Sequence, residues 1–252
     1  MDLLYVVGTG SKHDNIELRM SLRSICKYAR NLGRVVVAGY PPDWLSDEVQ
    51  KVRIENKYGR KHQNIMLCIQ KVVDMGLLHG EFLYSSDDHF YVKPVDFDNY
   101  PIFLKSTNLR DTAVKGERFY GYHLSLKQTR ELLVKYGLPY LNFEQHCNTH
   151  MNADVVRNFR ELINASYETE RGCAPTSLIM NAWMSQPYAP KNVIKRGDIK
   201  VRDANSVQDI RDRIGNAECF SISDSAFSKQ ALEDFFKEEY PEPCRFEKEG
   251  VK

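Results

Sequence analysis

The chain has 252 residues, of which 42% are hydrophobic and 27% charged, and its formal net charge is +1. This length and composition are typical of one soluble α/β domain, and the near-zero charge excludes the global basic field that favours nucleic-acid binding. No stretch is apolar enough for a membrane span, and the first residues lack a secretory pattern. The six cysteines have no CxxC spacing, which favours reduced thiols in a cytoplasm.

The first hundred residues alternate between strand and helix patterns. Residues 3–7 predict a buried strand, residues 34–38 a second strand and residues 49–54 a short third strand. Apolar residues at helical spacing predict amphipathic helices at 15–29 and at about 62–75. This order predicts a mostly parallel, doubly wound sheet, in which ligands bind beyond the carboxyl ends of the strands.

A tight turn, Gly8-Thr9-Gly10-Ser11, follows the first predicted strand. It resembles the start of a dinucleotide fingerprint, but GxGxxG would need glycine at position 13, where the chain has His13. A nicotinamide or flavin enzyme is therefore not expected, and the Walker pattern is also absent. The turn can still present backbone N–H groups to a phosphate or a nucleoside.

Arg19 and Arg23 lie one turn apart on the first predicted helix, outside its apolar face. They are either two solvated arginines near Glu17 or a basic pair close to a diphosphate. The second interpretation rests on chemistry, because planar guanidinium donors suit anionic oxygens.

The strongest functional signal is a pair of carboxylates, Asp87 and Asp88, after an apolar run at residues 81–86. Two anions at a sheet edge require protonation, a basic neighbour or a hard divalent cation, and oxygen ligands of this kind suit Mg²⁺ or Mn²⁺. In the predicted sheet, this pair and the glycine turn line one crevice. The alternative is a solvated acidic turn between two strands.

After Pro94 the pattern changes to shorter segments. The predicted elements are strands at 102–104 and 119–122 and helices at 125–136, 153–164, 175–185 and 224–238. Because no repeat, low-complexity tract or clean linker interrupts the chain, we predict one domain over residues 1–252 with a helical C-terminal part.

A second polar cluster, Asn-Phe-Glu-Gln-His, occupies residues 142–146. Glu144 could serve as a general base and His146 as a metal or phosphate ligand, if the fold brings them to Asp88. His150 follows four residues after His146, but the glutamate of the HExxH zinc motif is missing. A histidine pair on a helix surface is the commoner explanation for that spacing.

Together these segments resemble the Stealth-like sugar transferases, which are related to GT-A glycosyltransferases of bacterial capsule loci and phages. The Asp-Asp block and the first helix are the most specific parts. The similar blocks cover nearly the whole chain and comprise residues 3–11, 15–24, 42–45, 82–94, 142–146, 220–224 and 240–247. The chain departs from the family pattern in its Gly-Thr-Gly-Ser turn, where Asp-Gly-Ser is usual, and at Asn148, where a proline is usual.

The resemblance implies a GT-A-like (Rossmann-type) fold with a mostly parallel central sheet, helices on both faces and a helical C-terminal part. The implied activity is metal-dependent transfer of a sugar from a nucleotide-diphosphate sugar, with a UDP-sugar favoured, to an acceptor hydroxyl. Residues 1–100 would bind the nucleotide sugar, and residues 101–252 would form the acceptor side and helical half.

The resemblance also assigns roles at the reaction centre. Asp88 would bind a Mn²⁺ or Mg²⁺ that bridges the diphosphate, with His146 as an additional ligand. Asp87 and Glu144 would be the catalytic side chains, Asp87 through ribose or sugar hydroxyls and Glu144 as the base for the acceptor hydroxyl.

The implied nucleotide-sugar site is formed by the turn and two further residues. Gly8, Thr9, Gly10 and Asn64 would lie at the nucleoside, and Arg19 would lie near the diphosphate.

Three alternative functions stay open. A sugar-1-phosphate transferase would break the diphosphate itself and release a nucleoside monophosphate. A phage enzyme that glycosylates a hydroxymethylated DNA base would need a basic groove, for which residues 51–61 and 191–200 are candidates. A non-catalytic nucleotide-sugar-binding module would keep the fold without turnover. The sequence does not indicate whether the acceptor is a glycan or a modified DNA base. It also does not indicate the oligomeric state.

Overall fold

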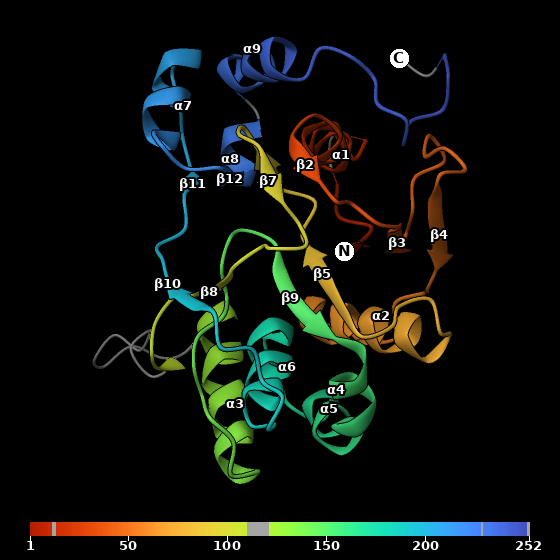
Figure 1. Cartoon of the computed structure of the whole chain (residues 1–252), viewed down its shortest axis with the longest axis vertical. Helices are drawn as coiled ribbons and strands as arrows, with labels where there is room; N and C mark the ends of the chain where they lie inside the picture. Colours follow the sequence, from red (N-terminus) through yellow and green to blue (C-terminus); the bar gives the residue numbers. More distant parts are fainter. Residues whose placement is uncertain (12–13, 110–120, 228, 251–252) are drawn as a thin grey trace.

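The computed structural model describes residues 1–11, 14–109, 121–227 and 229–250. A central five-stranded sheet is flanked by helices, and a smaller layer of short strands and helices forms the C-terminal part (Figure 1). Within these residues, no helix is both long enough and apolar enough to cross a membrane.

The central sheet has the strand order β4-β3-β1-β5-β9. Four of its strands run parallel, and the fifth pairs antiparallel with β5 at one edge. The strands are β1 (Asp2–Val7), β3 (Val35–Gly39), β4 (Val49–Arg53), β5 (Glu81–Ser85) and β9 (Thr149–Asn152). The predicted mixed α/β fold with a mostly parallel sheet is therefore confirmed, whereas β9 was not predicted.

Helices cover both faces of this sheet. Alternate residues of β1 point to opposite faces, so that Leu3 and Tyr5 pack with α1 (Ile16–Tyr28), whereas Leu4 packs with α2 (Lys61–Asp74). All three side chains are completely buried. Burial on both faces explains why this strand is a continuous apolar run.

A group of helices packs on the α2 side of the sheet (Figure 1). These helices are α3 (Gly121–Lys135), α4 (Ala153–Asn158), α5 (Arg160–Tyr167) and α6 (Pro175–Met184). The strand predicted at 119–122 is wrong for Gly121 and Tyr122, which begin α3, while residues 119 and 120 lie outside the described residues.

The C-terminal part contains strands as well as the helices that the sequence predicted. A three-stranded sheet of order β11-β12-β6 joins β6, which directly follows the aspartate pair, to β12 in antiparallel register. The remaining elements are β6 (His89–Tyr91), β11 (Lys200–Val201), β12 (Cys219–Ile222), β8 (Ile102–Leu104) with β10 (Val193–Lys195), β2 (Ala29–Arg30) with β7 (Val95–Asp96), α7 (Val207–Ile214), α8 (Asp224–Phe227) and α9 (Gln230–Glu239).

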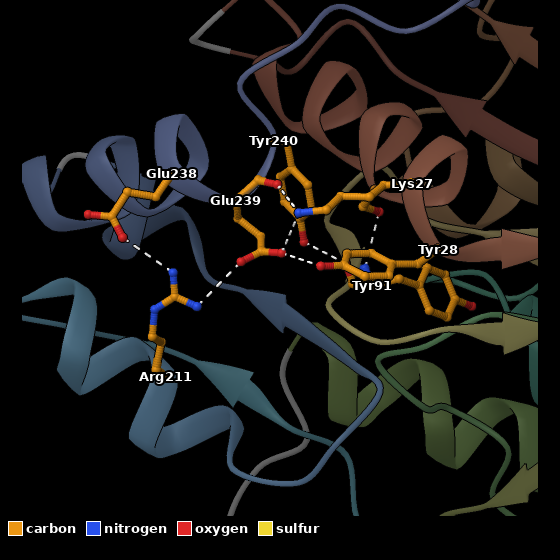
Figure 2. A network of polar contacts seen from close by, with 8 residues as sticks. Lys27, Tyr28, Tyr91, Arg211, Glu238, Glu239 and Tyr240 are labelled. Atoms are coloured by element: carbon orange, nitrogen blue, oxygen red, sulfur yellow. Dashed lines mark hydrogen bonds and ion pairs between the residues drawn. The ribbon is translucent and has the colours of Figure 1, made fainter.

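A polar network fastens α7 and α9 to α1 (Figure 2). The Glu239 carboxylate accepts hydrogen bonds from Lys27 Nζ at 2.9 Å, from the Tyr28 hydroxyl and from Arg211 Nη1 at 3.3 Å. Burial disfavours the charged form of Glu239 and would raise its pKa. The hydrogen bonds from Tyr28 and Lys27 outweigh this effect of burial and hold the pKa of Glu239 below its usual value.

A second charged group lies on α1 beside the C-terminal segment. The Arg23 guanidinium donates to both carboxylate oxygens of Glu247, at 2.7 and 2.8 Å, and Arg19 Nε lies 3.7 Å from Glu247 Oε2. The Arg19 guanidinium also stacks over the Trp44 ring, 4.8 Å from its centroid. The Glu247 side chain is only 2% exposed. Both interpretations of the arginine pair are therefore wrong, because it is neither solvated nor free to bind a diphosphate.

Candidate functional site

A cleft of about 530 Å³ lies at the carboxyl ends of β1, β4 and β5. The chain runs from β1 outward to β3 and β4 and then returns to β5 on the other side of β1, so the strand order reverses between β1 and β5. Ligands of open α/β sheets bind at such a reversal. The cleft is lined mainly by residues 8–11 after β1, residues 56–61 after β4 and residues 86–88 after β5. The glycine turn and the aspartate pair thus share one crevice, as predicted.

The glycine turn leaves the backbone of this wall accessible. Among the described residues, a Cβ atom added at Gly10 would meet no atom within 4 Å, and one added at Gly8 would meet only the Gly10 nitrogen at 4.0 Å. Packing against the protein therefore does not require glycine here, and the missing side chains let a ligand approach the main chain. Ser11 Oγ joins the turn to α1 by donating to Glu17 Oε2 at 3.1 Å.

The start of α2 forms a basic wall. Arg60 is the N-cap residue and Lys61 the first helical residue, both are exposed, and both line the cleft. The Arg60 side chain makes no capping hydrogen bond, and the first turn of the helix carries no acidic residue. Unpaired N–H groups and two cationic side chains at one helix terminus make a favourable environment for an anion.

Asn64 shapes the same wall. Its Oδ1 accepts hydrogen bonds from the backbone N–H groups of Lys57 at 3.1 Å and Tyr58 at 3.0 Å, and its Nδ2 donates to the Tyr58 carbonyl at 2.7 Å. The side chain lines the cleft, but its amide holds the loop after β4 in place. Tyr58 also lines the cleft and stacks on Tyr167, with ring centroids 4.7 Å apart.

The aspartate pair makes another part of the cleft lining acidic. Burial and the neighbouring Asp88 carboxylate raise the pKa of Asp87 to about 6, against the opposing charge of Lys61. Asp88 Oδ1 lies 3.8 Å from Nε2 of the buried His89. Burial lowers the pKa of His89, although the Asp88 charge acts in the other direction. The cleft is therefore lined by an anionic pair and by a cationic helix terminus.

The raised pKa of Asp87 predicts a pH-dependent gain in stability from Asp87→Asn. In the unfolded chain this carboxyl titrates near pH 4. The charged carboxylate therefore destabilises the folded protein above about pH 6, and this effect is absent below about pH 4, where the group is protonated in both states. We expect Asp87→Asn to raise the free energy of unfolding at pH 8 by about 2 kcal/mol, with the gain shrinking as the pH falls through 6. Urea denaturation at pH 4, 6 and 8 measures it, and a gain that is largest at pH 4 would contradict the environment described for Asp87.

Glu144 does not line the cleft. Its Oε1 accepts a hydrogen bond from the Ser177 N–H at 2.8 Å and so satisfies a donor in the first turn of α6. Burial raises the pKa of Glu144. Glu144 is near enough to act on Tyr84, a cleft residue whose pKa is raised by burial and then by the charges of Glu144, Asp87 and Asp88. The structure thus places Glu144 near the site and not on its wall.

His146 also lies beside the cleft and not in its lining. Its Nε2 is 3.5 Å from Asp198 Oδ2, which accepts a hydrogen bond from Lys105 Nζ at 3.0 Å. Burial and the charge of Lys200 lower the pKa of His146 to about 4. The imidazole is therefore neutral at physiological pH.

The prediction that His146 and His150 form a pair on a helix surface is wrong. His150 is buried in β9, where it lies opposite Leu83 and donates through Nε2 to the Tyr100 carbonyl at 2.6 Å. Strand pairing with β5, and not the four-residue spacing, decides where this side chain lies.

The structure also corrects the predicted position of Arg19 near the diphosphate. It belongs to the ion-pair group with Glu247 and does not line the cleft, so the structure does not bring it to a diphosphate there. The basic side chains that do line the cleft, Arg60 and Lys61, were recognised in the sequence only as part of a locally basic segment. Their position after a predicted strand, at the start of a predicted helix, is a signal that would have placed them at the crevice.

Asp87 and Asp88 can hold a divalent cation only if other groups supply its remaining ligands. No three His, Cys, Asp or Glu side chains among the described residues are gathered into a metal site. Mg²⁺ and Mn²⁺ need only one or two protein carboxylates where phosphate oxygens and water supply the other ligands. Asp87 and Asp88 present such carboxylates at the cleft, and a cation would offset the repulsion between them. The donor set therefore suits a cation shared with a phosphate group.

Comparisons with known proteins leave the family open. A scan against protein-family models found no match, and no curated protein matched the sequence. Among solved structures, a glycosyltransferase involved in the glycosylation of the major capsid of PBCV-1 matches with 11% identity and a TM-score of 0.41, covering 93% of this chain and 98% of that chain. A likeness with so low a TM-score supports no conclusion about fold or function. The resemblance to the Stealth-like transferases thus has no family match behind it.

Proposed function

We propose that this protein is a glycosyltransferase that moves a sugar from a nucleotide-diphosphate sugar to an acceptor hydroxyl, with Mn²⁺ or Mg²⁺ held at Asp87 and Asp88. The supporting observation is that one cleft is lined both by an aspartate pair and by a cationic helix terminus. A nucleoside diphosphate carrying a divalent cation has the complementary arrangement, because its phosphates suit Arg60 and Lys61 while its cation suits the carboxylate pair. We favour a UDP-sugar, as the family resemblance implies.

The chemistry of such a transfer depends on the charge that develops on the leaving diphosphate. Bound at the carboxylates, a divalent cation supplies Lewis-acid stabilisation of that charge. Arg60, Lys61 and the first N–H groups of α2 add fixed positive charge on the other side of the phosphates. The glycine turn lets the nucleoside approach the main chain.

We infer that the two halves of the chain have different tasks. Among the described residues, those that line the cleft lie between Val6 and Asp88, except Ile222, which supports residues 1–100 as the donor-binding half. Residues 101–252 would then carry the acceptor side. Glu144 stays our candidate base, since a carboxyl whose pKa is raised by burial suits proton acceptance. His146 is assigned to the acceptor side and not to the cation.

Ligand-dependent thermal stability tests the donor assignment. We expect nucleotide-diphosphate sugars to raise the Tm by several degrees with Mn²⁺ and much less without it, because a ligand that binds only the folded state stabilises it by mass action. Lys61→Ala should weaken donor binding about tenfold or more, through loss of a charge-assisted contact. Lys71→Ala, at an exposed position near the other end of α2, is the matched control and should bind normally.

Three results would contradict or refine the proposal. If no nucleotide sugar changes the Tm in the presence of Mn²⁺, or if Lys61→Ala and Lys71→Ala behave alike, the cleft is not the donor site proposed here. If turnover releases a nucleoside monophosphate and not a diphosphate, the reaction is sugar-1-phosphate transfer.

A further inference from the structure

The C-terminal segment, residues 239–248, lies along α1. Arg23 Nη1 donates to the Tyr240 carbonyl at 3.2 Å, and Lys27 Nζ donates to the Glu239 carbonyl at 2.7 Å. Cys26 lies between these two residues on α1, and residues three or four apart on a helix share a face. The thiol of Cys26 is therefore on the side of α1 that meets this segment, which contains Cys244.

Cys26 and Cys244 line the same cavity, of about 760 Å³, between α1 and the C-terminal segment. Both thiols are free and only partly buried, whereas the other four cysteines are buried. Both also pack against the same hydrophobic cluster. The cavity thus connects two neighbouring thiols to solvent.

Each thiol affects the ionisation of the other. A hydrogen bond with Cys244 lowers the pKa of Cys26, and the Arg245 guanidinium lowers it further against the effect of burial. The same hydrogen bond, together with burial, raises the pKa of Cys244. Cys26 is accordingly the thiol that ionises first, and the thiolate is the reactive form of cysteine.

We propose that Cys26 and Cys244 form a reversible dithiol–disulfide site that reacts with hydroperoxides. The Cys26 thiolate attacks a peroxide oxygen, the O–O bond breaks, and Cys26 becomes a sulfenic acid as the first water, or an alcohol, leaves. The sulfur of Cys244 then attacks the Cys26 sulfur, its proton passes to the departing hydroxyl, and a second water leaves. With hydrogen peroxide, two thiols and one peroxide give one disulfide and two waters.

A second pair of cysteines provides an internal comparison. Cys147 and Cys219 also interact through their thiols, but their residues are only 7% and 4% exposed. These buried thiols are less accessible to a peroxide in solvent than the partly buried thiols of Cys26 and Cys244. We therefore expect peroxide to oxidise the Cys26–Cys244 pair selectively, although Cys147 and Cys219 are also neighbours.

Oxidation of the purified, reduced, full-length protein with hydrogen peroxide tests the proposal. Digestion with trypsin without reductant should yield peptide 24–27 linked to peptide 238–245, and reduction should separate them. Because the new bond joins residues that are far apart in sequence, we expect oxidation to raise the Tm by about 5–10 °C, reversibly with dithiothreitol. Cys244→Ser should show neither the link nor the rise, whereas Cys173→Ser should show both.

Three outcomes would overturn the assignment. One is oxidation of Cys26 to a sulfinic acid while Cys244 stays a thiol. Another is a disulfide between two chains and not within one. The third is a link between the peptides of Cys147 and Cys219 in place of the expected one. The peptide masses come from the unmutated chain, so none of these results depends on whether a variant folds or on the proposed transferase activity.

Discussion

Asp88→Asn is expected to reduce sugar transfer in the presence of Mn²⁺ by about 100-fold or more while the protein folds at least as stably as the parent. The substitution keeps the shape of the side chain but removes a charge that a hard divalent cation requires. It also relieves the repulsion that raises the pKa of Asp87. The release of nucleoside diphosphate measures the activity, and thermal denaturation measures the stability.

The control for this prediction is Asp43→Asn, at an exposed position in the loop after β3, which should transfer sugar at the parental rate. A chelator should reproduce the loss in the parent protein. If the parent retains full activity in chelator, or if Asp88→Asn is as active as Asp43→Asn, the aspartate pair has a structural role and the reaction proceeds without a bound cation.

Glu247→Ala is expected to lower the free energy of unfolding by about 3 kcal/mol, because removing one partner of a buried ion pair leaves the other charge without compensation. Two guanidinium groups, those of Arg19 and Arg23, depend on this one carboxylate, which is 2% exposed. Glu247 also accepts the Cys244 N–H at 2.9 Å, so the loss includes a backbone contact. Urea denaturation at neutral pH measures the change.

Glu249→Ala, two residues further along and exposed, is the matched control and should change the stability by less than about 0.5 kcal/mol. Glu247→Gln separates the two contributions, since glutamine can still accept the Cys244 N–H but cannot neutralise the arginines. A loss below about 1 kcal/mol for Glu247→Ala would mean that solvent reaches the arginines and replaces their partner.

The elements that the sequence predicted well are those with strong local patterns. The four parallel strands and the first two helices lie in apolar or amphipathic segments, and the structure contains each of them within a few residues of its predicted bounds. The shared crevice followed from topology, because loops after neighbouring parallel strands meet at one sheet edge. Neither inference required knowledge of a contact between distant residues.

The features that were missed depend on such contacts. Thr149–Asn152 has no apolar alternation, and it becomes a strand because it pairs with β5. Arg19 and Arg23 look like solvent-facing helix residues until Glu247, near the other end of the chain, covers them. The carboxylate of Glu144 faces a helix terminus that lies about thirty residues further along. Tertiary context thus overrides the local pattern at all three places.

The pairing of β6 with β12 also limits how this chain could be divided. The donor cleft is formed almost entirely by the first ninety residues, which suggests a module that could be excised or exchanged. Yet the chain passes from Asp88 directly into His89–Tyr91, whose antiparallel partner is Cys219–Ser221. A fragment that ended near residue 100 would keep nearly every residue of the cleft and lose the strand that anchors the chain just after its carboxylates. In evolution or in engineering, the two halves can therefore diverge in sequence but have to be inherited together.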